Sequence, residues 1–285
     1  MDQALPQSTP SGILPVGALL RHAWETFSGH LKQYLPLSIV VIIFPVIISA
    51  LTANWLTDLP QNPTAADWTA LTNQLSTNGP LIGLIFFVAV IAAAVLGVLG
   101  ALAMIHVAKD SSRSAGQALK ASLGQFWSYL WIAVLIFLFV VGVMLSAGII
   151  LAVLVKLANL LGSASVVFGA ILGGLALVAA AVYVVYQTVR WTFAYYILVD
   201  EGLTGRTALR RSAAVVTNRW WAVVGRFIVL GLIVMVAQMI IGAVLSAAGG
   251  ALGTMVAQFL INIVVAPISI IYAYTIYHNL RANQH

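Results

Sequence analysis

Six apolar runs, each about as long as a bilayer is thick, are the feature that most restricts how this chain can fold. A helix rises about 1.5 Å per residue and the hydrocarbon core is about 30 Å thick, so one crossing takes about 20 apolar residues. The runs lack the strict polar and apolar alternation of barrel strands. The sequence therefore predicts an all-α membrane protein with six transmembrane helices, at residues 34–53, 81–108, 129–155, 165–190, 221–247 and 252–277.

The composition supports this class and excludes an ordinary soluble protein. Of 285 residues, 62% are hydrophobic and only 7% are charged, with a mean hydropathy of +1.04, whereas soluble domains carry about 25% charged residues. We expect a cytoplasmic tail at residues 1–16 and a single six-span domain at 17–285. The tail has Asp2 and three prolines where a signal peptide would be basic and then apolar, so we expect no cleavage. The absence of cysteine excludes disulfides and thiolate metal sites.

The distribution of basic residues predicts the orientation of the spans. With a cytoplasmic N-terminus, all of the 13 lysines and arginines except Lys156 lie on the cytoplasmic side. The positive-inside rule then places both termini in the cytoplasm. Residues 56–79, which contain Asp58 and Asp67 but no basic residue, become an external loop. Short turns at 156–164 and around Gly250 make the later spans antiparallel, so three hairpins are expected.

Small residues one helical turn apart suggest where helices approach closely. Such spacing lets two helix backbones come together in a membrane. It also arises by chance in a chain rich in glycine and alanine, so both interpretations stay open. The pairs are Gly97 and Gly100, Gly169 and Gly173, and Gly249 and Gly253.

A short basic amphipathic segment occurs three times, starting at Ala18-Leu19, Ala118-Leu119 and Ala208-Leu209. Each copy precedes a hairpin, and each is predicted to be an interfacial helix lying on the membrane. In the second copy, Ser114 and Gln117 have the spacing of a capping box. The predicted apolar faces are Leu20, Ala23, Trp24 and Phe27 in the first copy, Leu119, Leu123 and Phe126 in the second, and Leu209, Ala213 and Val216 in the third.

Aromatic residues follow each copy where the chain is expected to enter the bilayer. Such rings favour the headgroup level, where one edge is wet and the other apolar. The basic segments then have two interpretations: they contact anionic lipid headgroups, or they are elbows that only fix the register of the spans. The aromatic residues are Tyr34, Trp127, Tyr129, Trp131, Trp220 and Trp221.

Two sets of polar residues are candidates for binding. On a helix Tyr183, Gln187 and Arg190 share one face, and Gln238 and Asn262 lie on later spans. This polar stripe would either receive a phosphate headgroup or be structural, with Arg190 snorkelling or pairing with an acid at 200–201. The candidate lipid-headgroup or anion contacts are Arg21, Lys120, Arg190, Arg206, Arg210, Arg211 and Arg219.

No catalytic constellation can be assembled from the sequence. The seven acids are dispersed in loops, tails and interfacial segments, and His106 has no metal-ligating residue at suitable spacing beside it. The basic residues are spread among the elbows rather than gathered in one patch, which favours lipid over nucleic acid as a partner. We therefore expect no enzyme, no metal and no cofactor.

The region from residue 190 to 221 resembles a known family. It reads Arg190 to Gly202 as RWTFAYYILVDEG, then Ala208 to Ser212 as ALRRS, then Arg219-Trp220-Trp221. This is similar to the membrane domain attached to some bacterial glycerophosphoryl diester phosphodiesterases and found alone in other six-span proteins. The resemblance implies a bacterial inner-membrane protein and brings no established activity. Clustered acids and histidines of a phosphodiesterase site are absent from the sequence.

Three functions remain open at this level. The first is a non-enzymatic protein that engages anionic phospholipid in envelope or lipid homeostasis. The second is a transporter of lipid or small solutes with a cavity between the hairpins. The third is a structural module that assembles with itself or with a membrane-protein partner.

Overall fold

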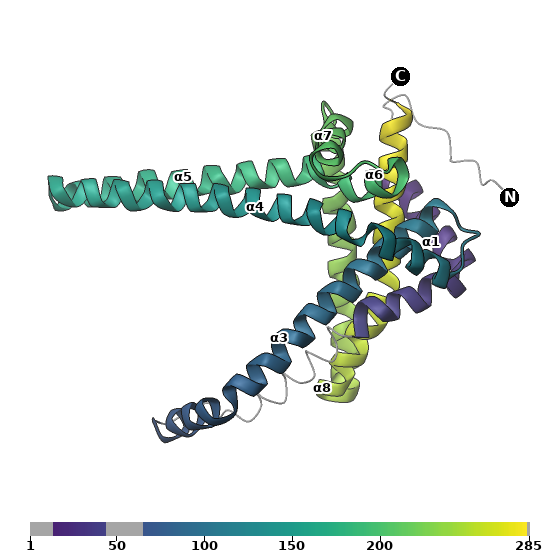
Figure 1. The fold of residues 1–285 in the computed structure, drawn as a ribbon, viewed down its shortest axis with the longest axis horizontal. Coiled ribbons are helices and arrows are strands. Elements are labelled where there is room, and N and C mark those ends of the chain that lie inside the picture. The colour runs from purple at the N-terminus through teal and green to yellow at the C-terminus, as the bar shows by residue number, and fades with distance from the viewer. Residues whose placement is uncertain (1–13, 44–64, 284–285) are drawn as a thin grey trace. The chain divides into compact units, whose positions relative to one another are not determined.

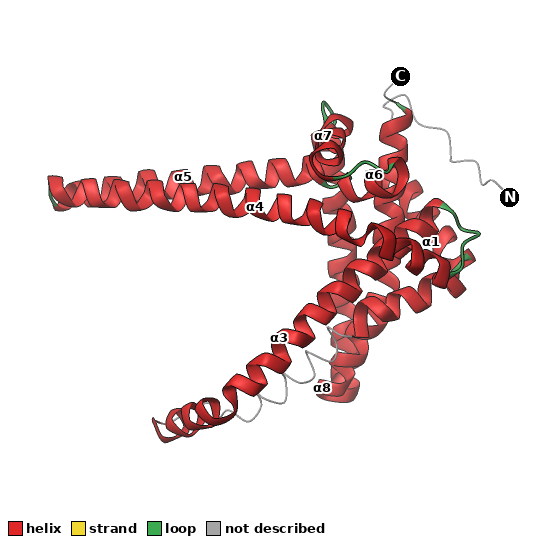
Figure 2. Ribbon diagram, viewed as in Figure 1, coloured by secondary structure: helices red, strands yellow, loops and turns green. Residues whose placement is uncertain are grey.

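The computed structural model describes residues 14–43 and 65–283, and every regular element in these two ranges is a helix (Figures 1 and 2). Residues 44–53 of the first predicted span and 56–64 of the predicted external loop lie outside this description. The helices are α1 (Val16–Gly29), Leu31–Ile43, α3 (Ala65–Lys109), α4 (Ala115–Leu161), α5 (Ser163–Trp191), α6 (Ala194–Glu201), α7 (Gly205–Val216) and α8 (Trp220–Ala282).

Five helical segments in the described ranges are long and apolar enough to cross a membrane, which confirms the predicted all-α membrane class. They overlap the last five of the six predicted runs, and the described part of the first run is the shorter apolar helix Leu31–Ile43. The segments are Phe87–Lys109, Ala115–Leu160, Val167–Glu201, Trp220–Gly250 and Val256–Ala282.

The chain forms two compact units that interleave along the sequence. The first contains, among the described residues, residue 14, Gln125–Phe227 and 276–283. The second contains residues 15–43, 65–124 and Ile228–Thr275. Helices α4 and α8 each pass from one unit into the other.

In the first unit, α4 and α5 lie side by side along most of their length (Figure 1). Glycines make this approach possible. A Cβ atom at Gly169 would lie 2.8 Å from the Ala158 Cβ and 2.9 Å from the Leu154 carbonyl oxygen, and one at Gly173 would collide with Leu151. The predicted glycine pair at 169 and 173 therefore does mark a helix contact.

Helix α8 consists of two helical segments divided at Gly250. This residue has φ 56° and ψ −134°, a backbone conformation that glycine adopts without steric cost. Just beyond it, a Cβ atom at Gly253 would overlap the carbonyl oxygen of Leu245, so the chain folds tightly on itself here. The break falls where the sequence predicts the third external turn. No neighbouring atom lies within 4 Å of a Cβ at Gly249, so only Gly253 of that pair needs to be small.

In the second unit, α1 ends at Gly29, and after His30 the chain continues into the helix Leu31–Ile43. Helix α3 packs against this helix through Gly100, whose Cβ would meet the Val41 side chain and the Leu37 carbonyl oxygen. A Cβ atom at Gly97 would meet no atom of the described residues within 4 Å. Tyr34 is fully buried, so its predicted position among lipid headgroups is wrong: its ring packs inside this unit, 6.2 Å from that of Phe27.

The second basic segment does not form a separate interfacial helix, contrary to the prediction. Helix α4 runs from Ala115 to Leu161 as one element. Nothing between the segment and the span breaks the helix, whereas Gly29-His30 interrupts the first copy and Asn218, with φ 66°, interrupts the third. The predicted capping box at its start is confirmed: Ser114 Oγ accepts the Gln117 N–H at 3.3 Å, and Gln117 Oε1 accepts the Ser114 N–H at 3.1 Å.

Candidate functional site

The third basic segment and the residues around it form the most elaborate polar arrangement in the first unit. Helix α7 packs on α5 and α6. Its predicted apolar face, Leu209, Ala213 and Val216, is buried. The face that the sequence assigned to the membrane surface is therefore covered by protein. The physical reason is the helix α6, which the sequence reading missed and which supplies buried apolar residues of its own.

Ser212 connects α7 to the break between α5 and α6. Its side-chain oxygen accepts the backbone N–H of Phe193 at 3.2 Å and donates to the backbone carbonyl of Arg190 at 2.7 Å. Ser212 and Phe193 are both fully buried. At the end of a helix the backbone groups lack partners within the helix, and this hydroxyl supplies them. It thereby holds the bend after α5.

Two adjacent acids at the end of α6 join two other helices, α7 and α8. Arg281 near the end of α8 pairs with Asp200 and lies 3.7 Å from Glu201. Arg211 of α7 pairs with Glu201 at 3.3 Å, and the Tyr277 hydroxyl donates to Glu201 at 2.9 Å. The Asp200 and Glu201 side chains are only 10% and 15% exposed. We call these five residues the acid–arginine cluster.

The polar stripe predicted on α5 exists as a chain of hydrogen bonds. Gln187 Nε2 donates to the Tyr183 hydroxyl at 3.3 Å, and Arg190 Nη1 donates to Gln187 Oε1 at 3.2 Å. The Arg190 guanidinium also lies over the Tyr186 ring, 5.6 Å from its centre. Of the alternatives for Arg190, pairing with an acid at 200–201 is not found among the described residues, where Arg281 and Arg211 hold those carboxylates.

Gln238 and Asn262, the other members of the predicted stripe, belong to the second unit. They lie on the two segments of α8, each twelve residues from Gly250. Asn262 donates to the backbone carbonyl of Gln258 at 2.8 Å, a bond within its own helix. The local bond explains how this amide is accommodated in an apolar segment.

The candidate headgroup contacts differ sharply in what they already bind. Arg206 and Arg210 of α7 are exposed, and no acid among the described residues pairs with either. Lys120 is exposed on α4, and Arg21 is exposed on α1 with Glu25 at 2.9 Å. The guanidinium of Arg211, by contrast, is committed to the acid–arginine cluster.

Arg219 is engaged with the end of the chain. Its Nη2 donates to the carbonyl of Asn283 at 2.9 Å, while its Nη1 is buried and has no hydrogen-bond partner among the described residues. Arg226, which is not among the candidate headgroup contacts, donates twice to the Leu14 carbonyl, at 3.0 and 3.1 Å. These two arginines tie both ends of the described chain to the start of α8.

The apolar faces of the other two copies are covered less completely. In α1, Ala23 and Phe27 are buried, but Trp24 is 55% exposed. In the second copy, Leu123 is 58% exposed. Trp127 and Trp221 are exposed. The three copies thus share a sequence pattern without sharing one packing arrangement.

The acid–arginine cluster and the role of Ser212 were not predicted. A serine after two arginines carries no sequence signal of a buried cap, and Asp200 and Arg281 are 81 residues apart. Among the described residues, no group of three or more histidines and acids has the geometry to hold a metal ion.

Comparison of the chain with protein-family models, with curated proteins and with solved structures finds no match in any of the three.

Proposed function

We propose that this chain is a non-enzymatic membrane protein of six spans in three hairpins, whose basic elbows engage anionic phospholipid of the cytoplasmic leaflet. The setting is a bacterial inner membrane with both termini in the cytoplasm, in line with the charge distribution and the family resemblance of residues 190–221. The role is in envelope or lipid homeostasis.

One observation carries the lipid part of the proposal. Helix α7 is held by its buried face and by Ser212, while Arg206 and Arg210, one helical turn apart, are exposed and have no acid beside them among the described residues. Each arginine near an anionic leaflet contributes about 1 kcal/mol to binding. A rigid helix that presents two such charges loses little entropy when it meets a phosphate.

The test compares two double variants of equal charge. Arg206→Gln with Arg210→Gln should weaken retention of phosphatidylglycerol relative to phosphatidylcholine about tenfold or more, measured by native mass spectrometry. The control, Arg113→Gln with Lys156→Gln, removes one arginine that already pairs with Asp110 and one lysine predicted to be external. Equal lipid retention in the two double variants would refute the proposal.

The polar chain of Tyr183, Gln187 and Arg190 favours a transporter as the second candidate function. Its discriminating feature would be a water-accessible cavity lined by this stripe. Uptake of labelled lipid or solute into vesicles, abolished by Gln187→Leu but not by Thr188→Val, would support transport.

A further inference from the structure

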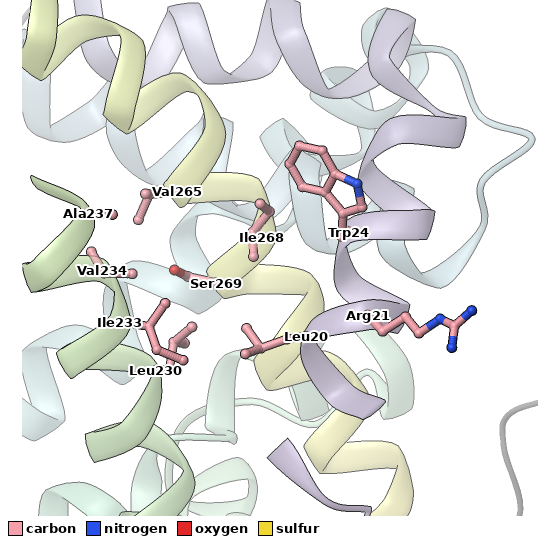
Figure 3. Close-up of a pocket in the computed structure, with 10 residues that line it drawn as sticks. All are labelled: Leu20, Arg21, Trp24, Leu230, Ile233, Val234, Ala237, Val265, Ile268 and Ser269. Carbon is pink, nitrogen blue, oxygen red and sulfur yellow. The ribbon is translucent and has the colours of Figure 1, made fainter. Parts of the chain in front are cut away.

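A largely apolar cavity of about 410 Å³ lies in the second unit, between α1 and the two segments of α8 (Figure 3). Leu20 and Trp24 of α1 form one wall. Leu230 and Ala237 belong to the first segment of α8, and Ile268 to the second. The volume is within the range of about 300–1,000 Å³ that is usual for ligand pockets.

The chemistry of the lining restricts what can occupy the cavity. Apart from Arg21 and Ser269, every lining residue is apolar. A water molecule needs two to four polar partners, and apolar cavities stay dry or take up apolar molecules. The occupant is therefore a hydrocarbon group rather than water or a polar solute.

The position along α8 identifies the source of that hydrocarbon. Leu230 is one helical turn beyond Arg226, and Ala237 is seven residues further, about 10 Å along the axis. The cavity thus begins one helical turn beyond Arg226, the only charged residue of the first α8 segment. It extends from there into the part of the helix expected to span the membrane. At that depth the surrounding medium consists of lipid acyl chains.

A cation stands at the edge of the cavity. Figure 3 shows Arg21 on the same helix as Leu20 and Trp24, with its guanidinium directed away from the lining side chains. That side chain is 82% exposed, and its present partner is the half-exposed Glu25. Exposed ion pairs of this kind contribute less than about 1 kcal/mol. A phosphate can therefore compete for the guanidinium.

We propose that this cavity binds one acyl chain of a phospholipid from the cytoplasmic leaflet, with the phosphate of that lipid at Arg21. The site uses α1 and α8, so it does not depend on the exposed arginines of α7. It would make the protein a holder of an individual lipid molecule rather than only a surface that attracts anionic lipid.

The main test fills the cavity. Ala237→Phe should weaken binding of one equivalent of phosphatidylglycerol at least about tenfold, because several methylene groups lose their burial. The control is Ala243→Phe, at an exposed position on the same helix that does not line the cavity. Delipidated protein is titrated with phosphatidylglycerol, and bound lipids are counted by native mass spectrometry. Equal binding by the two variants would overturn the acyl-chain site.

Two further experiments test the phosphate and the acyl chain of the lipid separately. Arg21→Gln should weaken phosphatidylglycerol binding about fivefold, and unchanged affinity would overturn the assignment of the phosphate. Glycerol phosphate, which has no acyl chain, should not displace the bound lipid, and displacement would overturn the role of the chain. The Arg206→Gln and Arg210→Gln double variant should leave binding in this cavity unchanged. Either proposal can therefore fail without the other.

A fluorescence measurement covers the case in which Ala237→Phe does not fold. Phosphatidylglycerol with brominated acyl chains should quench Trp24 when about one equivalent is bound. That saturable quenching should persist in Trp221→Phe, whose indole is also exposed, and disappear in Trp24→Phe. Its persistence in Trp24→Phe would overturn the proposal.

Discussion

Ser212 is a single side chain on which the geometry of the α5–α6–α7 region depends. Its hydroxyl has both a donor and an acceptor partner from a backbone segment about 20 residues away, and it is fully buried. A buried hydroxyl with both partners is stabilising, whereas its loss leaves a backbone N–H and a carbonyl unsatisfied. The effect of a substitution here should therefore exceed that of an exposed hydroxyl on the same helix.

Replacing Ser212 by alanine should lower the free energy of unfolding by about 1–3 kcal/mol. Thr207→Ala is the matched control, since its hydroxyl bonds the Thr204 carbonyl at an exposed position. Thermal unfolding in detergent, followed by intrinsic fluorescence, gives the comparison. Equal shifts in the melting temperature for the two variants would contradict the proposed role of Ser212.

The loss of a charge from the acid–arginine cluster should lower the free energy of unfolding more than the loss of a hydroxyl. Glu201→Gln removes the carboxylate that Arg211 and Arg281 share, and should destabilise by about 1–2 kcal/mol, because both arginines are partly exposed and water screens their charges. Tyr277→Phe removes one hydrogen bond and should cost about 1 kcal/mol. Urea or SDS titration measures both. A larger loss for Tyr277→Phe would show that the hydrogen bond of the hydroxyl, not the charge of Glu201, dominates.

At the scale of elements, the close approach of α4 and α5 depends on which glycine is replaced. Gly169→Ala places a methyl group against the Leu154 carbonyl oxygen and should destabilise by about 1–3 kcal/mol through overpacking. Gly174→Ala, where a Cβ meets no neighbour within 4 Å, should instead be neutral or stabilise by up to about 1 kcal/mol through helix propensity. Opposite signs in thermal unfolding are the expected result, and two equal losses would contradict the assigned contact.

The turn between α3 and α4 should be sensitive to acid. Asp110 accepts hydrogen bonds from the side chain and backbone of Ser112, at 2.6 and 3.1 Å, and pairs with Arg113 at 3.1 Å. These bonds, those from Ser112 first, hold the pKa of the Asp110 carboxyl below its ordinary value of 3.8. Because the folded-state value is the lower one, the stabilisation of the turn is present above pH 3.8 and is lost as the pH falls through that folded-state value.

A spin label tests this turn directly, since the chain has no native cysteine. A label at Ser111→Cys should become more mobile as the pH falls below 3.8. In the added presence of Asp110→Asn the label should already be mobile at pH 7 and show no such transition. An acid transition that survives in the Asp110→Asn variant would have to come from another group.

At the scale of the whole molecule, the predicted topology has both termini and all elbows on one side. Single cysteines can test it by labelling with a membrane-impermeant maleimide in right-side-out vesicles. Lys156→Cys should react at once, and Ser112→Cys should react only after the membrane is permeabilised. The reverse pattern would invert the orientation and remove the elbows from the cytoplasmic leaflet.

Some features of this protein could be predicted from its sequence because they depend on neighbouring residues. The helical membrane class follows from the apolar runs, the Ser114–Gln117 capping box from a spacing of three residues, and the break at Gly250 from its glycines. The glycine contacts were predictable only as candidates. The same spacing at Gly97 and Gly249 meets open space, since contact depends on what the facing helix presents.

Other features were decided only by the tertiary structure, because they join residues far apart in the chain. The sequence by itself determined that α7 is amphipathic, but its apolar face is covered by α5 and α6, which no periodicity within α7 reveals. The sequence offered Arg190 as a partner for the acids at 200–201, whereas the folded chain pairs Asp200 with Arg281, 81 positions away. Local pattern sets what each helix can bury, and the packing of distant helices decides which charges remain exposed.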